Sequence, residues 1–227
     1  MRNVLSILLA WLALGPLSWA DTTWVEGQHY FTVQPAQPTA VPRGKVEVIE
    51  VFSYGCPACN LFYPIIDKLK AALPAQARLG YLPASWHPEE GWKTFQRAFF
   101  AAQALGLVER THAAMFDAIW KSGELATLDS TTRTPLKQLP TIVDVSKFYA
   151  RVAHVKAEDF LDAAHSISVD ASMKQADAQI KAYQVDETPT VIVNGKYRLS
   201  PRSAGGNDQF VSLVKWLVKR ETTNASP

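Results

Sequence analysis

Two cysteines three positions apart are the residues best suited to chemistry in this sequence. Cys56 and Cys59 are the only cysteines among its 227 residues. A disulfide between them would close a very small loop and would therefore stabilise the fold little. Thiols at this spacing are suited to thiol–disulfide exchange, in which a thiolate attacks one sulfur of a disulfide. We predict that Cys56 is the attacking sulfur and Cys59 the resolving one.

The segments around the cysteines predict a strand before them and a helix after them. Residues 46–54 are rich in β-branched and aromatic side chains, and a helix is expected from Cys56 to Leu73. Pro57 falls in the first turn of this helix, where proline is tolerated and stiffens the turn. The N-terminus of a helix stabilises an anion, so Cys56 should have a lowered pKa. Cys59, one turn further on, should be more enclosed.

A Cys-x-x-Cys pair is also half of a common type of zinc site. Structural zinc normally takes four ligands, and the sequence has no second pair of this kind. Its five histidines are scattered and none forms a local pair with another histidine or cysteine. We therefore expect no metal, and no cofactor other than the redox-active Cys56–Cys59 disulfide itself.

Two other positions are candidates for the same site. Glu50 interrupts an apolar strand six residues before Cys56, where a buried carboxylate with a raised pKa would shuttle protons for Cys59. The alternative is a glutamate that faces solvent. Thr188 and Pro189 precede a short strand, and either they form a cis-proline loop beside the cysteines or Pro189 ends an ordinary trans turn. Most X-Pro bonds are trans, so the local sequence alone favours the turn.

The pattern along the chain separates two α/β segments by a long helical one. After the first strand and helix, residues 78–82 read as a second strand. Helical periodicity then dominates residues 89–168, apart from a polar loop at 127–140. A longer helix is expected at 170–183, a hairpin with an Asn194-Gly195 turn at 190–199, a last helix from about 207 to Arg220, and a loose tail from Glu221.

The N-terminus reads as an export signal. Arg2 precedes an apolar run that is too short to span a bilayer, and Ser18-Trp19-Ala20 is a small-x-Ala cleavage site. We expect residues 1–20 to be removed and the mature chain to begin at Asp21. The formal net charge of +2 gives no reason to expect nucleic acid as a partner. Export also implies an oxidising compartment, where disulfides persist.

Two segments resemble those of the DsbA family of periplasmic thiol:disulfide oxidoreductases. They are residues 50–59, EVFSYGCPAC, and residues 188–197, TPTVIVNGKY. The resemblance extends over nearly the whole mature chain, including the segment from Val155 to Phe160. It implies an α/β, thioredoxin-like fold with an inserted all-helical domain. The domain plan is then a signal peptide at 1–20, the first part of the thioredoxin-like domain at 21–88, the inserted helical domain at 89–168, and the second part at 169–227.

The resemblance also implies roles and partners. Glu50 matches the buried glutamate of the family and Pro189 matches its cis-proline, so both join the cysteines as catalytic candidates. Thr188, Pro189, Pro57 and Ala58 are the expected substrate contacts. The oxidised pair would be passed to reduced, unfolded exported proteins in the periplasm. A membrane quinone oxidase of the DsbB type would then reoxidise the enzyme, which we expect to be a monomer.

Two residues depart from the pattern of the strongest oxidants in that family. Ala58 stands where those enzymes carry histidine, so an imidazole that would stabilise the thiolate is absent and a milder oxidant is expected. Thr188 replaces a valine that often precedes the cis-proline, and its hydroxyl is able to hydrogen-bond a sulfur or a bound peptide.

Three other functions fit parts of the same sequence. A disulfide reductase or isomerase would use the same residues but would be kept reduced, and no segment before Lys45 is long enough to be an evident dimerisation module. A peptide-binding chaperone would not need the cysteines at all. A zinc-binding module lacks the further ligands described above.

Overall fold

The computed structural model describes residues 24–224, so the predicted signal peptide lies outside the described residues. Its elements, in chain order, are β1 (Phe31–Thr32), β2 (Val46–Phe52), α1 (Pro57–Ala72), β3 (Ala77–Pro83), a 3-10 turn (Pro88–Glu90), α2 (Trp92–Ala104), α3 (Val108–Trp120), α4 (Ile142–Ala153), α5 (Ala157–Ala164), α6 (Ile167–Ala182), β4 (Thr190–Val193), β5 (Tyr197–Leu199) and α7 (Asn207–Asn224).

One mixed sheet joins the two ends of the chain. Its strand order is β1-β5-β4-β2-β3, with β2 parallel to β3 and antiparallel to β4. All seven residues of β2 are buried, as expected for a central strand covered on both faces. The pairing of Val48 with Val193 shows that strands far apart in the sequence meet at the centre of the sheet.

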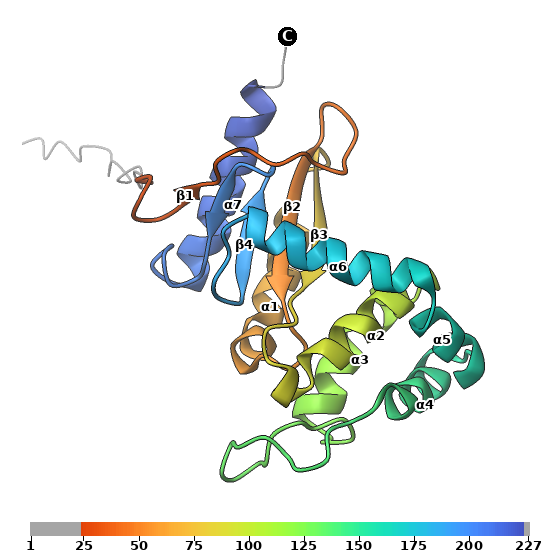
Figure 1. The fold of residues 1–227 in the computed structure, drawn as a ribbon. Coiled ribbons are helices and arrows are strands. Elements are labelled where there is room, and N and C mark those ends of the chain that lie inside the picture. The colour runs from red at the N-terminus through yellow and green to blue at the C-terminus, as the bar shows by residue number, and fades with distance from the viewer. Residues whose placement is uncertain (1–23, 225–227) are drawn as a thin grey trace, which may run out of the picture.

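Helices cover both faces of this sheet. Helices α1 and α7 lie against one face, and α6 lies across the other (Figure 1). The first face buries Val48, Val191 and Val193 against Phe62 of α1 and Phe210 of α7. Alternate residues of a strand point to opposite faces, so Ile49 and Val51 join the second core instead.

Helices α2 to α5 form a helical insertion beside the sheet (Figure 1). Helix α2 packs against both α5 and α6, and α4 packs against α5. The aromatic rings of Tyr149 and Phe160 stack at 4.3 Å between their centroids in the core of this insertion. The fold is therefore thioredoxin-like with an inserted helical unit, as the resemblance implied.

The predicted end of the first long strand and the predicted start of the helix at 170–183 were wrong, for identifiable reasons. Strand β2 ends at Phe52 rather than at residue 54, because the chain turns there and the Tyr54 carbonyl accepts a hydrogen bond from Trp120 Nε1 at 2.8 Å. Helix α6 begins at Ile167, because the Ser166 side chain caps it by accepting from the N–H of Val169.

The predicted loose tail was also wrong. Helix α7 continues to Asn224, because Glu221 is buried and held by three donors of the β4–β5 hairpin. These are Asn194 Nδ2 and Lys196 Nζ, each 2.6 Å from Glu221 Oε2, and the Tyr197 hydroxyl, 3.2 Å from Oε1. The hairpin and the last turns of α7 are therefore fixed to each other.

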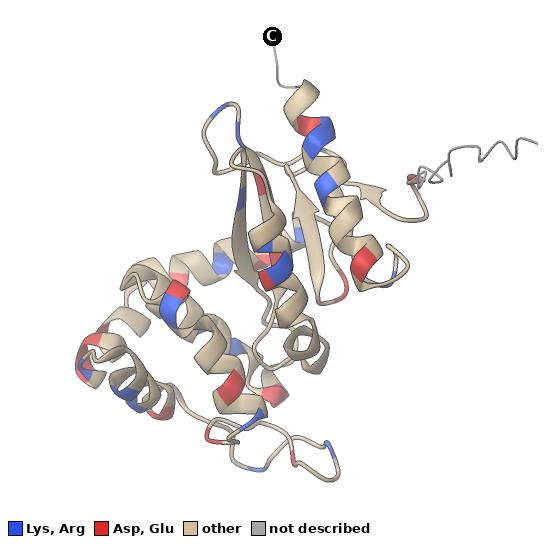
Figure 2. Cartoon of the chain, turned by 180° about the vertical axis from the view of Figure 1, so that it is seen from behind, with Lys and Arg blue, Asp and Glu red and all other residues tan. Residues whose placement is uncertain are grey.

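Charges of both signs are spread over the helices. On α7 the Lys and Arg residues lie between Asp208 and Glu221, and residues of both signs also occur on the helical insertion (Figure 2). Within residues 24–224, no helix is both long enough and apolar enough to cross a membrane.

Candidate active site

The two cysteines lie at the start of α1 with different environments. Cys56 is the N-cap residue of α1, and its Sγ accepts a hydrogen bond from the N–H of Cys59 at 3.4 Å. Cys56 is 5% exposed and Cys59 is fully buried, and both are free thiols. Pro57 and Ala58 between them are exposed. The structure therefore shows the dithiol form, with Cys56 as the accessible sulfur.

Thr188 reaches Cys56 from the loop that leads into β4. The Thr188 hydroxyl donates to Cys56 Sγ at 3.2 Å, and the Thr188 carbonyl lies 3.6 Å from the same sulfur. The Thr188–Pro189 peptide bond is cis. The structure thus brings Thr188 and Pro189 next to the cysteines, as the resemblance implied.

Hydrogen bonds separate the pKa values of the two thiols. The hydrogen bond from the Cys59 thiol, with those from Thr188 and from the N–H groups of Cys59 and Ala58, lowers the pKa of Cys56 to about 6 against the opposing effect of burial. Burial raises the pKa of Cys59 well above its usual value, and the same hydrogen bond and the charges of Cys56 and Glu50 raise it further. At neutral pH, Cys56 is the thiolate and Cys59 keeps its proton.

Glu50 is buried in the middle of β2, 2% exposed, between Tyr81 of β3 and Val191 of β4. Burial raises its pKa well above the ordinary value of 4.5, and the charges of Cys56 and Asp67 add to the effect. A carboxyl group in this state holds a proton close to Cys59. The alternative of a glutamate that faces solvent is excluded by this burial.

The helical insertion fixes the turn that precedes Cys56. Trp120 of α3 donates to the Tyr54 carbonyl, and the Tyr54 hydroxyl lies 2.7 Å from Nδ1 of His112, also on α3. Burial lowers the pKa of His112 to about 3, so its ring is neutral. The sequence analysis did not identify His112 or Trp120 as part of this support, because nothing near them in the sequence refers to the cysteines.

A second contact with the insertion passes through Gly55. A Cβ atom at Gly55 would lie 2.7 Å from Cδ1 of Trp92 and 3.4 Å from the carbonyl oxygen of Glu90. Only glycine leaves room for this approach. The residue just before Cys56 is therefore pressed against the start of α2.

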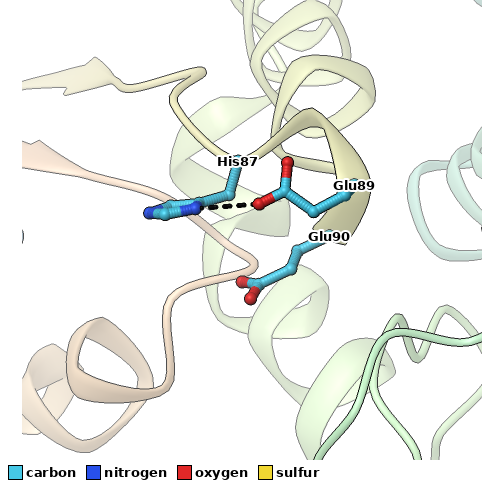
Figure 3. Close-up of side chains that lie close together, drawn as sticks. All are labelled: His87, Glu89 and Glu90. Carbon is cyan, nitrogen blue, oxygen red and sulfur yellow. Dashed lines mark hydrogen bonds and ion pairs between the residues drawn. The ribbon is translucent and has the colours of Figure 1, made fainter.

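One group of potential metal ligands borders this contact. His87, Glu89 and Glu90 have donor atoms that lie within 4.8 Å of one another, and His87 Nδ1 is 3.1 Å from Glu89 Oε1 (Figure 3). His87 and Glu89 are exposed, and Glu90 also accepts from Trp92 Nε1 at 3.2 Å. These residues form an acidic edge near the redox pair, and nothing beyond their proximity indicates a metal.

A groove opens beside the start of α1, where the cysteines lie, although neither cysteine is among its lining residues. It has a volume of about 260 Å³, and Ala58, Thr188 and Pro189 line it together with apolar Leu61 and Phe62. Leu61 is 78% exposed. Glu187 and Arg202 lie on the same groove, with 3.9 Å between Oε2 and Nη1. Pro57 is not among the lining residues.

The sequence analysis missed Leu61 and Arg202 as groove residues. Leu61 carried a usable signal, because it is an apolar side chain on an exposed position of an amphipathic helix. Arg202 carried none, because only the packing of the β5–α7 loop brings it beside Glu187.

The asymmetric dithiol at the start of α1, on a sheet of this topology, defines a thiol–disulfide oxidoreductase of the thioredoxin fold. A model of the thioredoxin family matches residues 41–212. The chain is 32% identical over 226 residues to the thiol:disulfide interchange protein DsbA of Pseudomonas aeruginosa, covering 99% of each chain. It is 33% identical over 227 residues to DsbA of Pseudomonas syringae pv. tomato, covering 99% of this chain and 98% of that one.

Solved structures agree with these sequence matches. The crystal structure of Pseudomonas aeruginosa DsbA superposes with a TM-score of 0.75 at 32% identity, covering 89% of this chain and 96% of that chain. The chain belongs to the DsbA family and is a disulfide-forming oxidoreductase. Enzymes of this family use a cysteine pair as their redox centre.

Proposed function

We propose that this chain is exported to the periplasm, loses residues 1–20 there, and oxidises thiols of reduced, unfolded exported proteins. The observation that carries the direction of the reaction is the stabilised Cys56 thiolate beside a protonated Cys59. A stabilised thiolate is a good leaving group and favours the reduced enzyme, so the disulfide form gives up its bond readily. We retain the division into residues 21–88, 89–168 and 169–227 as its domain plan.

The reaction balances with the residues of this site. A substrate thiolate attacks Sγ of Cys56 in the oxidised pair, which breaks the Cys56–Cys59 bond and leaves Cys59 as a thiolate. Glu50 then gives its proton to Cys59. A second substrate thiolate attacks the substrate sulfur of the mixed disulfide and releases Cys56 as a thiolate. Two electrons pass from the substrate dithiol to the enzyme.

The surroundings of the cysteines suit an extended polypeptide. Thr188, Pro189 and Ala58 line the groove next to Cys56, and exposed Leu61 supplies an apolar surface for a side chain of the substrate. Pro57 stiffens the turn between the sulfurs. We propose that a membrane quinone oxidase of the DsbB type takes the two electrons and restores the disulfide, and that the enzyme acts as a monomer.

Single cysteine variants test this function. Cys56→Ser abolishes dithiol oxidation of a reduced, unfolded protein, because no sulfur remains for the substrate to attack. Cys59→Ser retains the Cys56 thiolate, which attacks a substrate that carries a disulfide, and the resulting mixed disulfide accumulates because no second enzyme sulfur releases it, so it is visible on non-reducing gels. Full oxidase activity in both variants would show that the site is wrongly assigned.

A further inference from the structure

A second cavity lies across the sheet from α1. It is open to solvent, has a volume of about 430 Å³, and is bounded by β2 and β3 on one side and by α2 and α6 on the other. It therefore lies where the sheet meets the helical insertion. Junctions of this kind are common places for small-molecule sites, and the volume falls in the range that such sites have.

The cavity contains a buried carboxylate that the redox site does not use. Glu47 of β2 lines it and is 8% exposed. Its Oε1 accepts a hydrogen bond from the N–H of Ala40 at 3.0 Å. Its Oε2 is buried and has no hydrogen-bond partner among the described residues. A buried carboxylate without a full set of donors destabilises the protein, and a cation bound in the cavity beside Glu47 would offset that free-energy cost.

The rest of the lining indicates the charge and shape of such a ligand. Among the described lining residues, Glu47 is the only one with a formal charge. Ser172, Gln175 and Gln179 of α6 add neutral polar groups, and Ile49, Leu82 and Phe100 add an apolar wall. Burial without a cation raises the pKa of Glu47, with the Ala40 hydrogen bond opposing the effect. A cationic donor attached to an apolar body would satisfy both kinds of surface.

We propose that this cavity binds a small organic ammonium compound, with the ammonium group paired with the Glu47 carboxylate and the hydrocarbon body against the apolar wall. No lysine or arginine among the described lining residues competes for the carboxylate. The site is separate from Cys56 and Cys59, and the inference does not depend on the direction of the redox reaction.

Benzylamine and its neutral analogue benzyl alcohol test the proposal. Both are titrated into the purified protein, with binding measured by calorimetry and located by the backbone amide shifts of Gly80, Ser172 and neighbouring residues. Benzylamine binds saturably and shifts these amides, and benzyl alcohol does not. Glu47→Gln weakens benzylamine binding about tenfold or more, as expected for the loss of a charge-assisted hydrogen bond. Glu158→Gln, at an exposed position on α5, leaves it unchanged.

A second variant keeps the test decisive if Glu47→Gln does not fold. Gln175 lines the cavity at an exposed position of α6, so Gln175→Lys adds a positive charge to the wall with little effect on folding. It abolishes benzylamine binding, while dithiol oxidase activity stays at the level of the unaltered protein. Equal binding of amine and alcohol, equal binding by the Gln175→Lys variant, or amide shifts confined to the groove beside Cys56 would each overturn the proposal.

Discussion

The hydroxyl of Thr188 lies 3.2 Å from Sγ of Cys56, although the two residues are 132 positions apart in the sequence. The contact gives the Cys56 thiolate a donor from outside its own helix. It also sets this chain apart from enzymes with valine at the position before the cis-proline, since valine has no donor.

Replacement of Thr188 by valine therefore raises the pKa of Cys56 above its value of about 6. A hydrogen bond to a charged group contributes about 1.5–3 kcal/mol, which corresponds to roughly one or two pKa units. The thiolate absorbance at 240 nm, followed against pH, measures the shift. Thr188→Ser keeps the hydroxyl and should stay close to the unaltered protein. A Thr188→Val curve that overlays the unaltered one would show that the contact does not stabilise the thiolate.

Glu50→Gln is expected to slow the step that protonates Cys59, so that mixed disulfides form and resolve more slowly in rapid-quench assays. The stability of the reduced protein gives a second measurement. Above pH 4.5 the carboxyl group of an unfolded chain loses its proton while buried Glu50 keeps it, so the folded state binds more protons and its stability falls as the pH rises.

Glutamine removes this titration. The free energy of unfolding of Glu50→Gln should therefore exceed that of the unaltered protein at pH 7, and the difference should shrink as the pH falls to 4. Urea denaturation at both pH values measures it. Glu158→Gln, at an exposed position, provides the comparison. If Glu50→Gln raised the free energy of unfolding by the same amount at both pH values, the raised pKa of Glu50 would be contradicted.

Gly55→Ala tests the contact between the turn before Cys56 and α2. The added Cβ would lie 2.7 Å from the Trp92 ring, so the ring or the turn must shift, and overpacking of this kind costs about 1–3 kcal/mol. Urea denaturation measures the loss, and tryptophan fluorescence reports the movement of Trp92. Gly80→Ala is the matched control, because a Cβ there meets nothing within 4 Å. Equal stability of the two variants would mean that the contact is not tight.

The redox potential of Cys56–Cys59 separates the oxidase from a reductase. Equilibration in a glutathione buffer series should give a value well above that of a reducing thioredoxin, because the Cys56 thiolate is stabilised. Ala58→His places an imidazole beside the thiolate, and a protonated neighbour stabilises it further, so this variant should be more oxidising. A potential as low as that of thioredoxin would favour the reductase.

Local sequence was enough to predict the chemistry of Cys56 and the elements that carry it. Residues within a few positions of Cys56 predict the strand before it, the helix after it and the interruption at Glu50. Local sequence does not predict the cis form of the Thr188–Pro189 bond, because most X-Pro bonds are trans. Only the resemblance to a family indicated it.

Features that join distant segments were beyond local sequence. The end of α7 was misjudged because Glu221 finds its partners on a hairpin 24 to 27 positions earlier. Glu47 stands at the start of a strand, where nothing beside it in the sequence indicates burial, yet α2 and α6 enclose it. Neither outcome follows from the residues next to these glutamates.

The pairing of β2 with β4 has a consequence for the order of events during folding. The whole helical insertion separates the two strands in the sequence. Contacts between segments so far apart in the chain form slowly during folding. Before that pairing Cys56 lacks the Thr188 hydroxyl and Cys59 lacks part of its burial, so the difference between the pKa values of the two thiols is smaller. The full asymmetry of the pair therefore depends on a long-range pairing of the sheet, and a chain in which β4 has not yet paired with β2 is expected to be the weaker oxidant.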